Sequence, residues 1–161
     1  MDRGQYDRPA ALAAWSGGAV LLRPGYLAEV GLFDERYFLY YEDADLSARG
    51  RARGWRYQFE PASVVRHRHA ASSGRASRVL RWHGERNRLL YLTKNGSAAT
   101  AGRAVVRHPL STLSYARRDV VGPLLDHRPI DTSTVGLRLS AYAAYLRLAP
   151  AMLAERRRLR R

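Results

Sequence analysis

Short apolar runs broken by glycine, proline and acidic residues characterise the chain over positions 1–74. An uninterrupted apolar run is typical of a buried strand, and alternation of apolar and polar residues is typical of a half-buried one. Pro24 can open a helix that Gly31 ends, and a second helix can begin where acidic residues favour the positive end of the helix dipole. The pattern predicts a strand over 19–23, helices over 24–30 and 42–53, and strands over 55–59 and 63–67.

From residue 75 onward, apolar residues recur at spacings of three and four, as in amphipathic helices. Asn95 and Gly96 should end the first of these helices, and Pro109 should kink or split the second. The first helix carries an apolar stripe formed by Val79, Trp82, Arg86, Leu89, Leu90 and Thr93. The predicted elements are helices over 75–95, 102–121 and 135–157, with a loop over 122–134.

The charge of the chain divides unequally between these two halves. Residues 1–74 hold 10 basic and 9 acidic residues, for a net charge of +1. Residues 75–161 hold 18 basic and 5 acidic residues, for a net charge of +13. This asymmetry predicts two domains. The first would carry the chemistry, and the second would bind an anionic surface or an anionic partner.

Composition narrows the classes of protein further. A length of 161 residues is enough for a folded core, and the absence of cysteine excludes disulfides and cysteine-ligated metals. The start of the chain, over positions 1–10, includes acids and no apolar segment, so we expect no signal peptide there. Because no uninterrupted apolar stretch reaches the roughly 18 residues of a membrane span, we expect the chain not to cross a bilayer.

The densest acidic cluster consists of Glu42, Asp43 and Asp45, next to Tyr40 and Tyr41. Backbone N–H groups at the start of a helix stabilise ionised carboxylates, so an acid there can act as a general base. An alternative is an acidic helix start, solvated and without chemistry.

An ordered series of motifs surrounds this cluster and resembles family 2 glycosyltransferases of the rhamnosyltransferase-like kind. The resemblance covers roughly Trp15 to Asn95 and implies an α/β fold of the GT-A type. We expect an incomplete GT-A domain over residues 1–74, its C-terminal half of short strands plus helices, followed by a mostly helical basic region over 75–161. The motifs are Ser16-Gly17-Gly18-Ala19, Leu22-Arg23, Val30 to Glu35, Phe38 to Leu46, Gly54-Trp55 and His67.

The resemblance implies inverting transfer of a sugar from a nucleotide-sugar donor to a saccharide acceptor, in synthesis of a cell-wall or surface polysaccharide. Asp43 matches the carboxylate that takes the proton from the acceptor hydroxyl. Glu42 would contact the acceptor sugar, and Asp45 would orient the site or the acceptor. For Asp45, the alternative is an acid that faces solvent at the start of a helix.

His67 resembles the family's histidine that joins a divalent cation, Mn²⁺ or Mg²⁺, on the donor diphosphate. Such cations prefer oxygen ligands, so one imidazole needs further ligands. A metal pair of His67 and His69, or a polar strand end without a metal, are the alternatives.

Trp15, Ser16, Gly17 and Gly18 resemble the segment that lines the acceptor pocket. Glycines allow close approach of the backbone to a ligand, and an indole offers a flat face to a sugar ring. A tight turn with a core tryptophan is the alternative. The following Phe33-Asp34 pair is interpreted as structural, with Phe33 in the core and Asp34 fixing a turn.

Asp43-Ala44-Asp45 has the letters of the D-x-D metal motif, but a nucleotide-binding region on the order of 100 residues should precede that motif. Only positions 1–42 precede Asp43, and they contain neither a βαβ pattern nor a glycine-rich phosphate loop. We therefore expect this chain to lack the donor-binding half, as a fragment or with a partner that supplies it. A non-catalytic binding protein of the membrane surface, built on a glycosyltransferase remnant, is the alternative function.

Arg86 and Arg88 lie in the segment that resembles the one following the catalytic domain in these transferases. A basic helix with an apolar stripe suits an anionic membrane surface, and such enzymes commonly act on polyprenyl-diphosphate-linked acceptors. Either arginine could contact that diphosphate, or be interfacial or internally paired. We expect a cytoplasmic protein peripheral to the inner face of the membrane, and no specific nucleic-acid partner.

Overall fold

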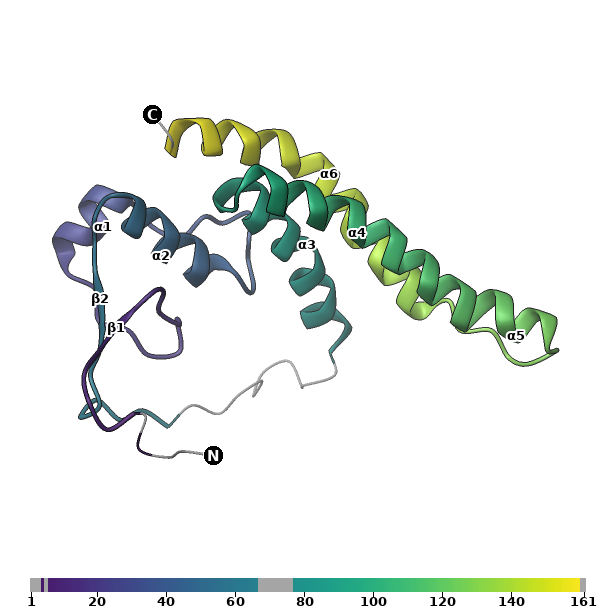
Figure 1. Cartoon of the computed structure of the whole chain (residues 1–161), viewed down its shortest axis with the longest axis horizontal. Coiled ribbons are helices and arrows are strands. Elements are labelled where there is room, and N and C mark those ends of the chain that lie inside the picture. Colours follow the sequence, from purple (N-terminus) through teal and green to yellow (C-terminus); the bar gives the residue numbers. More distant parts are fainter. Residues whose placement is uncertain (1–3, 5, 67–76, 160–161) are drawn as a thin grey trace. The chain divides into compact units, whose positions relative to one another are not determined.

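The computed structural model of the chain describes residues 4, 6–66 and 77–159 (Figure 1). The chain divides into two compact units, Met1–Arg75, the N-terminal unit, and Ala76–Arg161, the C-terminal unit. This division lies one residue from the boundary that the charge distribution suggests. The elements are predominantly helices, and the GT-A assignment stays a prediction.

The N-terminal unit combines two short helices with a two-stranded sheet. Its elements are β1 (Ala10–Leu12), α1 (Pro24–Val30), α2 (Glu42–Ala52) and β2 (Tyr57–Phe59). The strands pair antiparallel, with Ala10 opposite Phe59 and Leu12 opposite Tyr57. The sheet thereby joins the start of the unit to the segment that follows α2.

Both predicted helices of this unit are confirmed, and the strand predicted over 55–59 is confirmed in shortened form. The strand expected over 19–23 is wrong: Leu21 is 98% exposed, so this apolar run does not face a core. Residues 63–66 also form no strand, and residue 67 lies outside the described residues. The sequence pattern missed β1, because it predicts no strand before residue 19.

The core of the N-terminal unit is mainly aromatic and packs against one side of α2. Trp15, Tyr26, Val30 and Leu46 form a buried cluster. The Tyr26 hydroxyl donates to the Leu46 carbonyl at 2.7 Å, and the Tyr57 hydroxyl donates to the carbonyl of Ser47 at 2.6 Å. These bonds fix the tyrosine side chains against the helix, so that only a glycine fits at the position of Gly50.

A buried ion pair lies within α2, and its arginine also connects this helix to the end of α1. Arg49 Nε donates to Asp45 Oδ2 at 2.9 Å, and Asp45 is 0% exposed. The other guanidinium nitrogens of Arg49 donate to the backbone carbonyls of Val30 and Leu32, each at 2.6 Å. Arg49 therefore satisfies the end of α1 and the Asp45 carboxylate together, as a buried charge requires.

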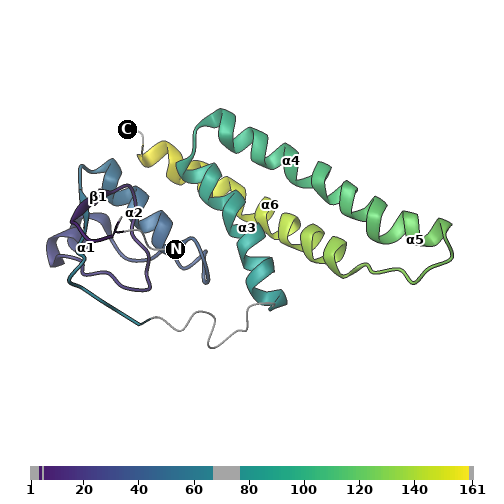
Figure 2. The same cartoon turned by 60° about the horizontal axis from the view of Figure 1, so that its bottom comes forward.

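The C-terminal unit is a helical assembly. Its elements are α3 (Arg78–Asn95), α4 (Ala98–Ala116), the π-helix η1 (Arg117–Val121), α5 (Gly122–Leu125) and α6 (Ser133–Leu159). Helix α6 packs along α3, and α4 lies beside α6 in the antiparallel direction (Figures 1 and 2). No helix in the described part of the chain has the length and apolar character that a membrane span needs.

The sequence predicts that Pro109 kinks or splits the second helix. It does not split it, because one helix runs from Ala98 through this proline, and the kink stays a prediction. Proline has no N–H to donate to the carbonyl four residues earlier, which here belongs to Val105. The hydroxyl of Tyr142, on α6, donates to that carbonyl at 3.3 Å. A side chain of a neighbouring helix thus supplies the hydrogen bond that Pro109 cannot make.

Buried polar side chains tie α3, α4 and α6 together. Arg138 on α6 forms an ion pair with Glu85 on α3 and donates to Thr112 Oγ1 on α4 at 3.0 Å. His108 on α4 places Nδ1 at 3.4 Å from Glu85 Oε2, and its ring stacks on Tyr142 with centroids 5.1 Å apart. The interior of this unit is therefore partly a network of charged and hydrogen-bonding groups.

Candidate functional site

Asp43 occupies the first turn of α2, the position that the sequence predicts for a carboxylate near the positive end of the helix dipole. Its side chain is partly exposed, and Asp43 forms no ion pair with any residue that the structure describes. The closed ion pair of this helix start belongs instead to Asp45. In contrast to Asp45, Asp43 is therefore an acid that a ligand in solvent can reach.

The structure brings Gly17 and Asp43 together, although 26 positions separate them in the sequence. The backbone N–H of Gly17 donates to Asp43 Oδ2 at 2.9 Å, and that of Ala44 donates to Oδ1 at 2.7 Å. These contacts orient the carboxylate. A carboxylate accepts about four hydrogen bonds, so Asp43 retains capacity for an incoming hydroxyl group.

Glu42 differs from Asp43 in its environment. Burial raises the pKa of its carboxyl group above the usual value, the hydrogen bond of its own backbone N–H opposes this, and the neighbouring Asp43 charge raises it further. One of its oxygens, Oε2, is buried without a hydrogen-bond partner in the described part of the chain. The two adjacent acids therefore lie in different environments: Asp43 accepts two backbone hydrogen bonds, whereas burial favours the protonated form of Glu42.

A strained aromatic segment precedes these two acids. Phe38, Tyr40 and Tyr41 have φ angles of 58°, 64° and 73°, in the left-handed region that side chains with a Cβ rarely adopt. Tyr41 is also the residue that precedes the first turn of α2. Such strain is concentrated at functional sites in proteins and persists only where surrounding contacts impose it.

The solvent-facing alternative for Asp45 is wrong, because its side chain is fully buried against Arg49. The Tyr37 hydroxyl lies 3.4 Å from its Oδ1, and burial followed by the Asp45 charge strongly raises the pKa of Tyr37. In this position Asp45 can hold the start of α2 in place but does not meet a ligand in solvent. Its predicted role in orienting the site stays a prediction.

Trp15 lies in the core rather than on an open surface. It is 8% exposed, and its ring meets Tyr57 and Phe33 edge to face, at centroid distances of 6.4 and 6.5 Å. The expected sugar-stacking face of Trp15 is therefore covered, and the core alternative describes the structure. Ser16, Gly17 and Gly18 are exposed beside it and remain available to an acceptor.

The prediction for the Phe33-Asp34 pair is half confirmed. Asp34 does fix a turn: its carbonyl accepts from Tyr37 N–H at 3.0 Å and its carboxylate accepts from Arg36 Nε at 2.7 Å. Placement of Phe33 in the core is wrong, because 49% of it is exposed. Its contact with Trp15 is at the edge of the aromatic cluster.

His67 and His69, the predicted metal ligands, lie outside the described residues. Within residues 4, 6–66 and 77–159, no three His, Asp or Glu side chains are grouped so that they could hold a metal ion. The divalent cation therefore stays a prediction, and we assign no step of a reaction to it.

Arg86 is internally engaged, whereas Arg88 is partly exposed. The guanidinium of Arg86 lies 4.8 Å from the centre of the Trp82 ring, and its Nε donates to Asn87 Oδ1 at 2.8 Å. Burial lowers the pKa of Arg86, which is 9% exposed. These contacts match the internally paired alternative for Arg86, and contact with a diphosphate stays a prediction for both arginines.

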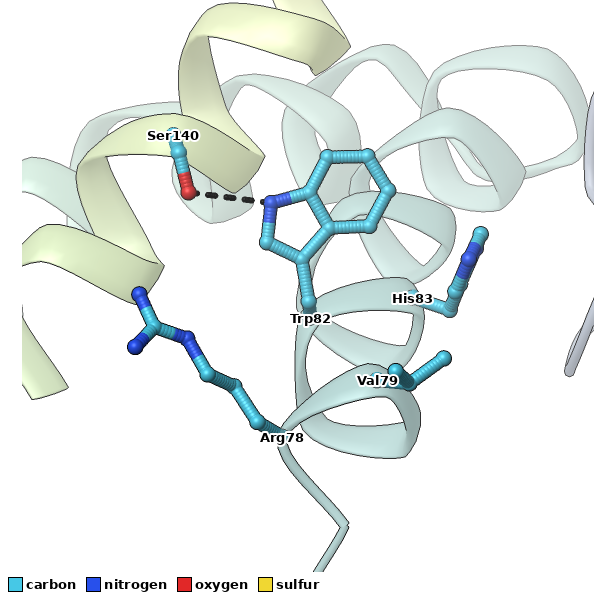
Figure 3. A pocket seen from close by; sticks show the side chains of 5 residues that line it. All are labelled: Arg78, Val79, Trp82, His83 and Ser140. Carbon is cyan, nitrogen blue, oxygen red and sulfur yellow. Dashed lines mark hydrogen bonds between the residues drawn. The ribbon is translucent and has the colours of Figure 1, made fainter. Parts of the chain in front are cut away.

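Beside Trp82, the C-terminal unit has an open hollow of about 370 Å³ (Figure 3). Trp82 Nε1 donates to Ser140 Oγ at 3.0 Å, which fixes the indole between α3 and α6. His83 lies on one side of the indole and Arg78 on the other, near Ser140. Burial and then the charge of Arg86 lower the pKa of His83. The remaining lining residue is Val79.

Sequence reasoning missed the partners that position these groups. The spacing of four between Asp45 and Arg49 could have indicated their ion pair, since such residues are neighbours on a helix. The pairing of Gly17 with Asp43 and of Glu85 with Arg138 joins residues far apart in the sequence. No local pattern reports such contacts.

Comparison with known proteins finds two partial relatives. A segment of 60 residues, 37% of this chain, is 45% identical to an N-acetylglucosaminyl-diphospho-decaprenol L-rhamnosyltransferase of Mycobacterium tuberculosis, strain CDC 1551 / Oshkosh. Part of this chain is glycosyltransferase-like. The same protein of strain ATCC 25618 / H37Rv matches with the same identity and coverage.

This glycosyltransferase-like chain spans about one fifth of the length of either relative in the matched region. No family model matches it. No solved structure matches it either. The similarity therefore supports a transferase-like function, and the particular reaction belongs to the proposal that follows.

Proposed function

We propose that this chain provides the acceptor side of an inverting glycosyltransferase of family 2, with Asp43 as the general base. The observation that carries the proposal is the pairing of Gly17 with a partly exposed Asp43 at the start of α2. The partial similarity to a rhamnosyltransferase supports the same class of reaction. We further propose that the N-terminal unit is the C-terminal half of a GT-A domain.

In the proposed step, a hydroxyl oxygen of the acceptor attacks the anomeric carbon of the donor sugar. The bond from that carbon to the nucleotide diphosphate breaks, and its electron pair leaves with the diphosphate. The proton of the hydroxyl passes to the Asp43 carboxylate, which two backbone N–H groups orient. Attack from the face opposite the leaving group inverts the anomeric configuration.

In this proposal the neighbouring residues position the acceptor and α2, and they take no part in making or breaking bonds. The exposed Ser16 and Gly18 flank Gly17, so an acceptor can approach the backbone closely at this segment. Glu42, whose side chain is partly exposed, contacts the acceptor sugar. Asp45 positions α2 through Arg49.

The acceptor we propose is a saccharide linked through a diphosphate to a polyprenol, in synthesis of a surface polysaccharide. The relatives are named for an N-acetylglucosaminyl-diphospho-decaprenol substrate and an L-rhamnosyl group. A lipid-linked acceptor places the protein at the cytoplasmic face of a membrane, to which the +13 charge of residues 75–161 is suited.

A transfer assay tests this function. Because the chain is proposed to provide only the acceptor side, the assay uses an intact version in which it is joined to a donor-binding half. This protein is incubated with Mn²⁺ or Mg²⁺, a panel of labelled nucleotide sugars including an L-rhamnosyl donor, and an N-acetylglucosaminyl-diphospho-lipid acceptor. The proposal expects a labelled disaccharide whose new linkage is inverted relative to the donor, as measured by NMR. No transfer from any donor, or a retained anomeric configuration, contradicts it.

A second candidate function is non-catalytic binding at the membrane surface, which the concentration of charge in residues 75–161 favours. Flotation with liposomes separates the two functions. Binding to anionic liposomes together with an absence of transfer supports this candidate. An absence of binding to both anionic and neutral liposomes contradicts it.

A further inference from the structure

Helix α4 packs into the C-terminal unit through small and polar side chains. Its buried residues are Ala104, His108 and Thr112, which follow one another at spacings of four. Two of them belong to the hydrogen-bonded interior: the His108 carbonyl accepts from the Thr112 hydroxyl at 2.8 Å, and Thr112 Oγ1 accepts from Arg138. The inward face of α4 is therefore mainly polar.

The opposite face of the same helix is apolar and exposed. Val106, Leu110 and Leu113 are 60%, 61% and 58% exposed, and spacings of four and three place them in one stripe. The apolar exposure continues past the end of α4, at Leu124 and Leu125 in α5. A helix of a globular protein normally turns such a stripe toward a core, so α4 has the reverse arrangement.

Helix α6 shows that this reversal is particular to α4. It also exposes leucines, at 139, 146 and 153. However, its buried face includes Leu137, Ala141 and Met152, as expected of a helix that packs on an apolar core. The apolar stripe of α4 has no such inward counterpart, apart from Ala104.

The charge around the stripe indicates what covers it. Arg103, Arg107 and Arg117 are exposed on the same helical segment, and residues 98–118 contain no Asp or Glu. A second copy of this chain would bring the same positive charges against one another, since the whole chain carries +14. An anionic surface with an apolar layer beneath it complements both the arginines and the leucines.

We propose that the outward face of α4 and α5 docks on an anionic lipid bilayer, with α4 lying in the plane of the interface. Val106, Leu110, Leu113, Leu124 and Leu125 enter the boundary between headgroups and acyl chains. The arginines bind lipid phosphates while their aliphatic parts follow the apolar surface. This inference deepens the proposed function, because it assigns the membrane contact to α4 and α5 rather than to the stripe of α3.

The stripe predicted on α3 does not face outward in the same way. Leu89 and Leu90 are 0% exposed and Thr93 is 3% exposed, so most of that stripe is already buried. Only Val79 and the partly exposed Trp82 remain at the surface, at the start of α3.

Co-sedimentation of the full chain with lipid vesicles tests the docking face. The vesicles contain either phosphatidylcholine alone or phosphatidylcholine mixed with a smaller proportion of the anionic lipid phosphatidylglycerol. We expect binding to the anionic vesicles to be stronger by about tenfold or more, and to weaken as salt is added. The double variant Leu110→Asp/Leu113→Asp should weaken that binding by about tenfold or more.

Two further variants separate apolar insertion from charge and from general effects. Arg103→Gln/Arg107→Gln should reduce binding to anionic vesicles by about tenfold and leave the weak binding to neutral vesicles unchanged. Leu21→Asp, at a leucine 98% exposed in the N-terminal unit, is the matched control and should bind as the parent chain does. Circular dichroism checks that each variant keeps its helix content.

Three results would overturn the docking face. They are undiminished vesicle binding by Leu110→Asp/Leu113→Asp, equal loss of binding in Leu21→Asp, and self-association of the parent chain that the double leucine variant abolishes. The test does not depend on turnover, because Asp43→Asn should bind vesicles like the parent. Conversely, loss of vesicle binding with normal transfer to a water-soluble acceptor leaves the proposed reaction intact.

Discussion

The two units of this chain use polar and apolar side chains in opposite ways. The N-terminal unit buries an aromatic cluster together with one ion pair, and it leaves Asp43 partly exposed at the start of α2. The C-terminal unit buries His108 and Arg138 between its helices beside the half-buried Glu85, and its α4 turns leucines outward. Hydrophobic periodicity therefore locates helices in both units but indicates the buried face correctly only where the core is apolar.

The largest effect should follow from removing the central cation of the C-terminal unit. Arg138→Met leaves the Glu85 carboxylate and Thr112 without their partner, and we expect a loss of about 3 kcal/mol in the free energy of unfolding. Urea unfolding followed by circular dichroism measures it. Arg147→Met, at an exposed position of α6, is the matched control and should change stability by less than about 0.5 kcal/mol. Equal effects would show that the polar interior does not stabilise this unit.

A pair of glycine substitutions should have opposite effects in the two units. A Cβ at Gly50 would overlap the rings of Tyr26 and Tyr57, so Gly50→Ala should cost about 1–3 kcal/mol. A Cβ at Gly84 in α3 meets no atom within 4 Å, so Gly84→Ala should stabilise by up to about 1 kcal/mol. Thermal unfolding of both variants checks the signs. Stabilisation by Gly50→Ala would refute the close approach of the two tyrosines to α2.

The smallest effects should appear in the dependence of stability on pH. Contact with His108 is the main cause that lowers the pKa of Glu85 and burial opposes it, while the charge of Arg138 adds to the lowering. Because the folded state binds this proton less tightly than the unfolded state, Glu85 contributes stability above the usual glutamate value, and that contribution is lost as the pH falls through its lowered pKa. The contribution of Glu42 to stability has the opposite sign. Because its pKa is raised in the folded state, this contribution is present below the usual glutamate value and is lost as the pH rises through the raised pKa.

Titration of both carboxyl groups by NMR measures these pKa directions, with the midpoint for Glu42 expected above the midpoint for Glu85. The variants Glu42→Gln and Glu85→Gln assign the two resonances. Midpoints in the reverse order would contradict the environments described for the two acids.

Local signals in the sequence were sufficient for most helices but not for their surroundings. Pro24, Gly31 and the acids from Glu42 mark helix ends, and α1 and α2 follow them closely. Leu21 and Val64 belong to apolar runs that resemble strands, yet both are exposed, because pairing and burial depend on segments elsewhere in the chain.

For the candidate site too, the sequence predicted the local element but not its surroundings. Three carboxylates within four consecutive positions indicated a helix start, but tertiary contacts decide which of them is buried and which is accessible. Asp45 is buried because Arg49 reaches it, and Asp43 is oriented by Gly17. Sequence alone could identify the cluster but could not distinguish the acid that stays accessible from the one that is enclosed.

The rate of sugar transfer by Asp43→Asn, measured in the intact version that includes a donor-binding half, tests the central claim most directly. Asparagine keeps the size of the side chain but cannot take the proton of the acceptor hydroxyl, so the account predicts a loss of about 10²- to 10⁴-fold in kcat. Glu60→Gln, an exposed acid of the same unit, should retain the parent rate. A rate for Asp43→Asn within about threefold of the parent, with the variant folded, would contradict the assignment of Asp43 as the base.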